Sequence, residues 1–286
     1  MRPLGSLHGA RRRASDRLLA ATTRRSGEKS RRRIVSRRSY DMVDLAEFTV
    51  ATRHYAGPVG ADSATVPAFV LVHGIGMSSR YFDQLAERLA QYGSVHLIDL
   101  PGYGRSATPP HDTTISDHAR VVGLFVTTLG HRHPVIVGHS MGTQVVTSLL
   151  AQRPEITDRL VLIAPTIYPG RRSSMAQALS LLADMPREPF RAQWTVTTDY
   201  LFRSGIPYYL TQLPHLVGDQ IEGRLASITA RTLVIRGTRD PIVPLHWAEN
   251  VTSLLPDATL VEVDGPHIVM AASPARVCEL IVAHAR

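Results

Sequence analysis

A serine occupies the centre of the glycine-flanked stretch Gly138-His139-Ser140-Met141-Gly142. The apolar run that leads into it, PVIVG, predicts a buried strand, and the segment after it, QVVTSLL, predicts a helix. A chain that turns sharply from strand to helix needs small residues on both sides of the turn, and it presents the side chain at the apex. The pattern therefore indicates that the hydroxyl of Ser140 is exposed as a nucleophile at a helix N-terminus.

An acid and a base follow further along the chain, each just after a predicted strand. Asp240 ends the segment TLVIRGTRD, and His267 ends the segment TLVEVDGPH. Because the carboxyl ends of parallel strands meet at one edge of a sheet, we expect both side chains to lie near Ser140. A serine hydroxyl needs a base to take its proton and a carboxylate to orient that base. We therefore predict Ser140 as nucleophile, His267 as base and Asp240 as the acid that orients it.

A site for the negative charge that such a reaction develops is predicted at the end of an earlier strand. The stretch His73-Gly74-Ile75-Gly76 closes the apolar run 66–72. The backbone N–H groups of Ile75 and Met141 are the natural pair of donors to an oxyanion. The glycine-rich loop 99–106 lacks the lysine and the helix start of a phosphate-binding loop, so we interpret it as a wall of the pocket.

Weaker patterns compete for these roles. Asp264 lies close to His267, but its Asp-Gly-Pro context favours a turn. His131 and His133 would form a metal pair without a third ligand. Cys278 is the only cysteine, which excludes an intramolecular disulfide and a cysteine-based metal cage. We expect neither a metal nor an organic cofactor.

The elements that position these residues alternate along the chain from residue 41 onward. Strands that are apolar throughout and alternate with helical patterns indicate a parallel sheet that is covered on both faces. The predicted strands are 66–72, 95–100, 134–138, 160–164, 232–235 and 259–263, and the predicted helices are 78–92, 115–129, 144–151 and 274–283.

Residues 167–228 interrupt this alternation. The segment has no convincing strand, contains five prolines and is rich in leucine and aromatic residues. Long insertions of this kind in an α/β domain are usually functional, so we predict a helical lid between the core segments 41–166 and 229–286. Trp194, Tyr208 and Tyr209 of the lid, together with Gly76, are predicted to contact an apolar substrate.

Charge is distributed unevenly along the 286 residues, of which 44% are hydrophobic. Residues 1–40 contain 13 basic and 2 acidic side chains, a surplus of +11, so the net charge of +8 leaves −3 for the remainder. This segment is predicted to be a disordered tail, or to reflect a translation start placed upstream of Met42. The alternative is that the segment makes weak electrostatic contacts with acidic lipid or nucleic acid. No specific nucleic-acid binding is expected. No apolar run reaches the ~18–20 residues of a membrane span or the ~7–15 of a signal peptide, from which we expect a cytoplasmic protein.

Five stretches together resemble the α/β-hydrolase fold family with a helical cap, over about residues 48–286. They are HGIG at 73–76, DLPGYGRS at 99–106, GHSMG at 138–142, GTRDPIVP at 237–244 and DGPH at 264–267. The resemblance implies a mostly parallel twisted sheet with helices on both faces and an inserted helical lid. It also implies the roles given above for Ser140, Asp240, His267, Ile75 and Met141. The sharp turn from strand to helix at Ser140 is called the elbow. Serine at the elbow argues against haloalkane dehalogenases and epoxide hydrolases, which carry aspartate there.

The activity expected from these features is hydrolysis of a carboxylic ester, or a related acyl compound, through an acyl-enzyme. Thioesterases, amidases or aminopeptidases, carbon–carbon bond hydrolases and cofactor-free haloperoxidases use the same triad, and the motifs do not separate them. The sequence Met-Gly-Thr after the elbow, where carbon–carbon hydrolases commonly have Met-Gly-Gly, is a modest point against that activity. A ligand receptor is an alternative of another class, and its turnover would lie far below the ~1–10³ s⁻¹ of typical enzymes.

Overall fold

The computed structural model describes residues 40–59, 66–166, 168 and 206–286. The chain divides into two units, Met1–Arg37 and Arg38–Arg286, and every described element belongs to the second. The predictions on the N-terminal tail, and those on residues 167 and 169–205 of the lid, lie outside the described residues. Within the described residues, no helix is both long and apolar enough to cross a membrane.

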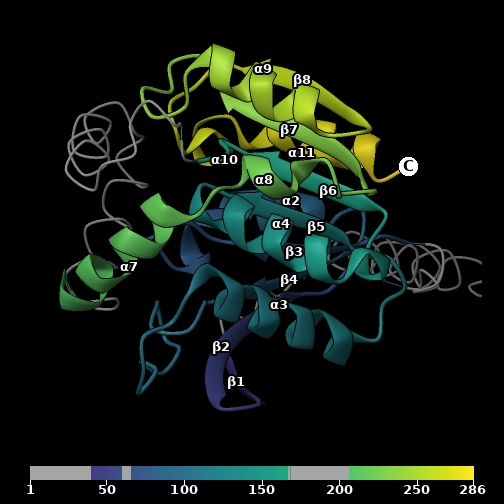
Figure 1. The fold of residues 1–286 in the computed structure, drawn as a ribbon. Coiled ribbons are helices and arrows are strands. Elements are labelled where there is room, and N and C mark those ends of the chain that lie inside the picture. Colours follow the sequence, from purple (N-terminus) through teal and green to yellow (C-terminus); the bar gives the residue numbers. More distant parts are fainter. Residues whose placement is uncertain (1–39, 60–65, 167, 169–205) are drawn as a thin grey trace, which may run out of the picture. The chain divides into compact units, whose positions relative to one another are not determined.

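Eight strands form one sheet in the order β1-β2-β4-β3-β5-β6-β7-β8 (Figure 1). All neighbours from β4 to β8 pair in parallel, whereas β1 pairs antiparallel with β2 and β2 pairs antiparallel with β4. The predicted mostly parallel sheet is therefore confirmed. The strands are β1 (Asp41–Leu45), β2 (Phe48–Tyr55), β3 (Ala68–Val72), β4 (Ser94–Ile98), β5 (Val135–His139), β6 (Arg159–Ile163), β7 (Arg231–Gly237) and β8 (Ala258–Val263).

Helices cover both faces of this sheet (Figure 1). Helices α3, α4, α8 and α9 pack on one face, and α2, α10 and α11 pack on the other. Their bounds are η1 (Ser79–Phe82), α2 (Asp83–Leu89), α3 (Ile115–Leu129), α4 (Met141–Gln152), η2 (Pro154–Ile156), α7 (Ile206–Gly218), α8 (Glu222–Leu225), α9 (Leu245–Leu254), α10 (Val269–Ala272) and α11 (Pro274–His284).

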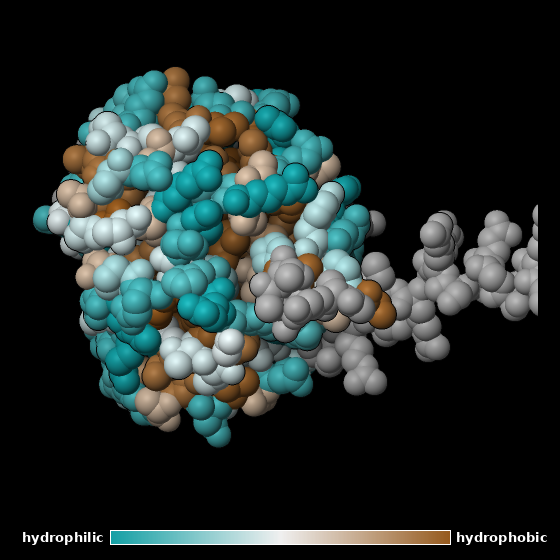
Figure 2. Space-filling view, turned by 90° about the vertical axis from the view of Figure 1, so that its right-hand side faces the viewer, coloured by the Kyte–Doolittle hydropathy of each residue, from teal (hydrophilic) through white to brown (hydrophobic). Residues whose placement is uncertain are grey.

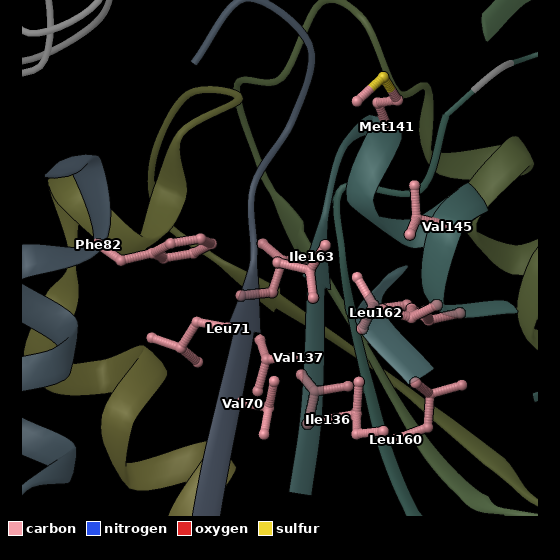
Figure 3. Close-up of a cluster of buried hydrophobic side chains, with 14 of the residues drawn as sticks. Val70, Leu71, Phe82, Ile136, Val137, Met141, Val145, Leu160, Leu162 and Ile163 are labelled. Carbon is pink, nitrogen blue, oxygen red and sulfur yellow. The ribbon is translucent and has the colours of Figure 1, made fainter. Parts of the chain in front are cut away.

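The central strands are buried on both faces because a helical layer lies on each side. Successive side chains of a strand point to opposite faces, so Leu71 of β3 lies on the side of Phe82, and Leu162 of β6 lies on the side of Val145 of α4 (Figure 3). All four side chains are fully buried. This packing fixes where β3, β5 and β6 end relative to one another, and with it the position of the loops that follow them.

One face of the described part is mainly polar (Figure 2). Figure 2 shows hydrophilic side chains over most of one face, with hydrophobic groups between them. The large hydrophobic side chains that are exposed among the described residues are scattered along the chain, and they are Met42, Val59, Tyr92, Leu210 and Leu245. Scattered exposed hydrophobic residues are normal for a globular protein and do not by themselves indicate an interface.

Candidate active site

Ser140 lies in a sharp turn between β5 and α4. Its backbone has φ 55° and ψ −123°, a conformation that a non-glycine residue adopts only under strain. The backbone N–H of Ser140 donates to the carbonyl of Ile163 at 3.0 Å, which ties the turn to β6. Gly142 is required on the helical side, because a Cβ there would lie 2.4 Å from the carbonyl oxygen of Val72. The local sequence thus produces the expected elbow, with Ser140 at its apex.

His267 connects Ser140 to Asp240. Its Nε2 lies 3.1 Å from Ser140 Oγ, and its Nδ1 lies 2.8 Å from Asp240 Oδ2. All three side chains are buried. Because an ionised carboxylate can only accept, Nδ1 carries the proton, and the lone pair of Nε2 accepts from the hydroxyl of Ser140. The structure therefore brings the three predicted residues together, with His267 between Ser140 and Asp240.

Backbone donors hold the carboxylate of Asp240 in place. Its Oδ1 accepts from the N–H groups of Ile242 at 2.8 Å and Val243 at 3.0 Å, which leaves Oδ2 for His267. The buried guanidinium of Arg236 braces the same loop, since its Nε donates to the carbonyl of Val243 at 2.6 Å. The sequence offered no clear signal for this use of Arg236, because an arginine in a strand is usually solvated.

The competing acid, Asp264, takes part in a different set of contacts. Its exposed carboxylate accepts from Thr238 Oγ1 at 3.2 Å and from Arg239 Nη2 at 3.3 Å. Its backbone carbonyl accepts from Ser273 Oγ at 2.8 Å. These contacts stabilise the turn before His267, as its sequence context indicates.

The loop after β3 lies directly against Ser140. A Cβ on Gly74 would lie 2.9 Å from Ser140 Cβ, so only glycine allows this approach. The next residue, Ile75, and the first residue of α4, Met141, each carry a backbone N–H that donates to no other described residue. The first N–H groups of a helix have no acceptor within it, and α4 begins at Met141, directly after Ser140. The two groups predicted for an oxyanion hole thus flank the elbow.

Two buried polar side chains fix this loop to the segment after β4. Asp99 accepts from the N–H groups of Ser79 at 2.7 Å and Arg105 at 2.9 Å, and burial raises the pKa of its carboxyl above the usual value. The N–H of Leu100 donates to His73 Nε2 at 2.8 Å, so the other ring nitrogen donates to the carbonyl of Gly74 at 2.8 Å. The loop 99–106 therefore supports the loop that carries Ile75.

Tyr81 and His139 form a second buried link that the sequence did not reveal. Tyr81 Oη lies 2.9 Å from the N of Gly74 and 2.8 Å from His139 Nδ1. His139 Nε2 lies 3.2 Å from the carbonyl oxygen of His267. Burial, followed by the proximity of His267, holds the pKa of His139 well below its ordinary value of 6.5, so His139 is neutral.

The residues predicted to contact substrate are distributed differently. Tyr208 of α7 donates to the carbonyl of Pro101 at 3.0 Å and packs on Gly102, where a Cβ would lie 2.2 Å from its ring. Tyr209 is buried in the hydrophobic core, and Gly76 adopts a φ of 71° in the loop after β3. Trp194 lies outside the described residues. Substrate contacts of these four residues remain predictions.

A metal centre has no structural support within the described ranges. Neither the pair His131 and His133 nor any other set there brings three His, Cys, Asp or Glu side chains into a metal-binding arrangement. The single cysteine, Cys278, is buried in α11.

The chain is similar in sequence to proteins of several bacteria. An uncharacterised protein of Mycobacterium tuberculosis is 35% identical over 98 residues, which cover 34% of this chain and 29% of that protein. The pimeloyl-acyl-carrier-protein methyl ester esterase of Vibrio campbellii is 34% identical over 98 residues, which cover 34% of this chain and 37% of the esterase. The chain thus matches less than two fifths of the length of these two relatives.

Structural similarity extends over more of the chain. The enol-lactonase of Burkholderia xenovorans superposes with a TM-score of 0.73 at 19% identity, over 85% of this chain and 99% of that one. At this identity the likeness concerns the fold. The family model described as the alpha/beta hydrolase family matches residues 69–280, which include all the predicted triad and oxyanion-hole residues. The chain therefore belongs to the alpha/beta hydrolase family.

Proposed function

We propose that this protein is a serine hydrolase that cleaves carboxylic esters, lactones included, through an acyl-enzyme intermediate. The observation that carries the proposal is the pair of contacts made by His267, at 3.1 Å to Ser140 Oγ and 2.8 Å to Asp240 Oδ2. A hydroxyl, an imidazole and a carboxylate joined in this order form the arrangement that activates serine in hydrolases on several unrelated folds.

In the proposed acylation step, Ser140 Oγ attacks the acyl carbon while His267 Nε2 takes the hydroxyl proton. The positive charge that forms on His267 is stabilised by Asp240, whose other oxygen is already fixed by two backbone N–H groups. The negative charge on the carbonyl oxygen is stabilised by the N–H groups of Ile75 and Met141. The tetrahedral intermediate then collapses, and His267 returns its proton to the departing alcohol.

Deacylation repeats these steps with water as the nucleophile. His267 takes a proton from the water, the same two N–H groups stabilise the second oxyanion, and Ser140 leaves as the protonated alcohol. No atom in this sequence of steps needs a metal ion or an organic cofactor. For a lactone, the departing alcohol remains attached to the acyl group, so that the product of both steps is a single hydroxy acid.

The substrate class rests on two further arguments. One relative is named a methyl ester esterase, and a protein with the same fold is named an enol-lactonase. Both names refer to the cleavage of a carboxylic ester bond. The proposed lid, residues 167–228, is rich in leucine and aromatic residues, which favours an apolar acyl or alcohol group. Helix α7, which belongs to this segment, is docked on the core through His118 Nε2 and Gln212 Oε1, 3.1 Å apart, and through the bond from Gln144 Nε2 to the carbonyl of Leu216 at 2.8 Å.

The test is steady-state hydrolysis of p-nitrophenyl esters from acetyl to long acyl chains by the wild type and by Ser140→Ala. A thioester and an anilide of the preferred acyl group show whether the departing atom matters. Turnover on esters that depends on the acyl length and is lost in Ser140→Ala supports the proposal. Equal turnover by Ser140→Ala would refute it, and Ser140-dependent cleavage of only the thioester or only the anilide would replace the ester by that bond.

A further inference from the structure

A continuous chain of buried hydrogen bonds runs from the loop after β3 to the backbone of His267. It comprises the contacts from the N of Gly74 to Tyr81 Oη at 2.9 Å, from Tyr81 Oη to His139 Nδ1 at 2.8 Å, and from His139 Nε2 to the oxygen of His267 at 3.2 Å. The side chains of Tyr81 and His139 are buried, and their rings meet edge to face with centroids 5.4 Å apart. The chain joins parts of the sequence that are 58 and 128 residues apart.

The direction of every bond in this chain is determined. The carbonyl of His267 can only accept, so His139 Nε2 carries the proton and donates it. His139 is neutral, because burial and the nearby His267 lower its pKa, so its Nδ1 has a lone pair and accepts from the hydroxyl of Tyr81. The backbone N–H of Gly74 can only donate, and it gives its proton to the oxygen of Tyr81. Burial holds the pKa of Tyr81 well above its usual value, so this hydroxyl keeps the proton that it donates.

Both ends of the chain lie at groups whose position decides the reaction. Gly74 directly precedes Ile75, one of the proposed oxyanion donors, and it lies in contact with Ser140. The other end is the backbone of the proposed base, His267. A displacement of about 1 Å in either group can lower the rate of a positioned reaction ~10²-fold. Loss of hydrogen bonds that fix these groups should therefore lower the rate.

We propose that Tyr81 and His139 are positioning residues, which hold the oxyanion loop and the base in register through this directed hydrogen-bond chain. The proposal rests on the proposed function, since it assigns the chain to the Ser140–His267 site. Neither side chain exchanges a proton with substrate. The neutral imidazole is well suited to this position, because it accepts on one edge and donates on the other without adding charge next to the base.

Two substitutions interrupt this series of hydrogen bonds, and two others serve as controls. Tyr81→Phe removes only the hydroxyl, and His139→Leu removes both ring nitrogens. His139→Gln keeps an acceptor and a donor in one side chain. Tyr55→Phe is the matched control for Tyr81→Phe, because Tyr55 is also buried and its hydroxyl also has two partners, Arg53 at 2.8 Å and Asp83 at 3.2 Å. Tyr55 pairs with Val95 at the end of the sheet opposite to Ser140.

We expect Tyr81→Phe and His139→Leu each to lower kcat on the preferred p-nitrophenyl ester by about 10- to 100-fold, with KM unchanged within about threefold. His139→Gln should regain most of the loss. Tyr55→Phe should keep the wild-type kcat while its melting temperature falls at least as far as that of Tyr81→Phe. The proposal is overturned if Tyr81→Phe keeps the wild-type kcat, or if Tyr55→Phe loses as much.

A second measurement needs neither substrate nor turnover. ¹⁵N NMR of the imidazole groups at pH 7, with the His139 signals assigned by their absence in His139→Gln, reports which ring nitrogen carries the proton. We expect a protonated Nε2 and an unprotonated Nδ1. The opposite tautomer would refute the proposed hydrogen-bond chain through His139. Loss of the proposed function would appear separately, as hydrolysis by Ser140→Ala that equals the wild type, and in that case the NMR result still decides whether the hydrogen-bond chain exists.

Discussion

Replacing Asp240 with asparagine tests the proposed mechanism at the group whose contacts are best defined. The carboxylate has two distinct oxygens, since Oδ1 accepts from the N–H groups of Ile242 and Val243, and Oδ2 accepts from His267 Nδ1. An asparagine amide has one oxygen and one NH2 group. If the NH2 group took the place of Oδ1, it would face two N–H donors. The amide oxygen must therefore occupy that place, and the NH2 group must face His267.

This orientation reverses the tautomer of the base. His267 Nδ1 would have to accept from the new NH2 group, so its proton would move to Nε2, the atom that lies 3.1 Å from Ser140 Oγ. A protonated Nε2 cannot take the proton of the hydroxyl. A wrong tautomer of this kind costs about 10⁴-fold in kcat in a characterised serine protease. At 1.36 kcal/mol per factor of ten, this corresponds to about 5 kcal/mol in the activation free energy.

The assay compares kcat and KM of Asp240→Asn with those of the wild type on the best p-nitrophenyl ester. We expect the loss in kcat, with KM within about threefold, because the substituted group does not contact substrate. Asp264→Asn is the matched control: the same change in a carboxylate three residues from His267 that is 78% exposed. It should leave kcat unchanged. A kcat of Asp240→Asn within tenfold of the wild type, or an equal loss in Asp264→Asn, would refute the reasoning.

Three more outcomes follow from the structure. Gly74→Ala places a methyl group 2.9 Å from Ser140 Cβ, so kcat should fall by at least ~10²-fold while circular dichroism stays that of the wild type; a normal kcat would contradict the packing. Leu71→Ala, in a fully buried strand, should lower the free energy of unfolding by about 2–5 kcal/mol in urea titrations, and a loss below about 1 kcal/mol would show that the core relaxes around the cavity. Burial lowers the pKa of His118 to about 4 from 6.5, so between these pH values the unfolded chain binds a proton that the folded chain does not. The free energy of unfolding should therefore decline as the pH falls from 6.5 towards 4, by up to about 1.4 kcal/mol per pH unit from this residue. Urea titrations of the wild type and His118→Asn across this range test it, since an equally steep decline in the variant would exclude His118 as a cause.

The sequence predicts the central sheet well because each parallel strand carries its own signal. A strand that is covered on both faces must be apolar over most of its length, and β3, β5, β6 and β7 each contain an apolar run for this reason. Helix α3 has the predicted bounds, Ile115–Leu129, and the structure shows why: a capping box at Thr114 starts it and Gly130 ends it.

The antiparallel edge of the sheet was not predicted. In β1, the segment DMVDL buries only its last residue, Leu45, and its pattern is too short to distinguish from a loop. Its partner β2 is mostly buried, yet it includes Arg53 and His54, which interrupt an apolar pattern. Arg53 is accommodated by Asp83 and Tyr55, residues that no local pattern connects with it. Tertiary pairing thus determines these two strands more than their own sequence does.

The residues of the proposed site also fall into two groups, those that the sequence predicts and those that depend on tertiary packing. Ser140, Asp240 and His267 could be found because each follows a strand at one edge of the sheet, where topology alone brings them together. Tyr81 and His139 could not, because their contact depends on how η1 packs on the elbow, and neither spacing nor composition encodes that packing. The position of His139 next to the nucleophile was the one available signal, and it says nothing about the ring's partners.

Neutrality of His139 is a requirement of the proposed mechanism. During the reaction this imidazole becomes positively charged, and the ring of His139 lies with its centroid only 4.9 Å away. Two positive charges at that distance would repel by about 3 kcal/mol at an effective dielectric constant of ~20, which would disfavour the protonated base by about two orders of magnitude. Burial lowers the pKa of His139 and prevents this charge, and the bond from Tyr81 occupies the lone pair that a second proton would need. In the proposed mechanism, the contacts that fix the position of His139 therefore also keep a second positive charge away from His267.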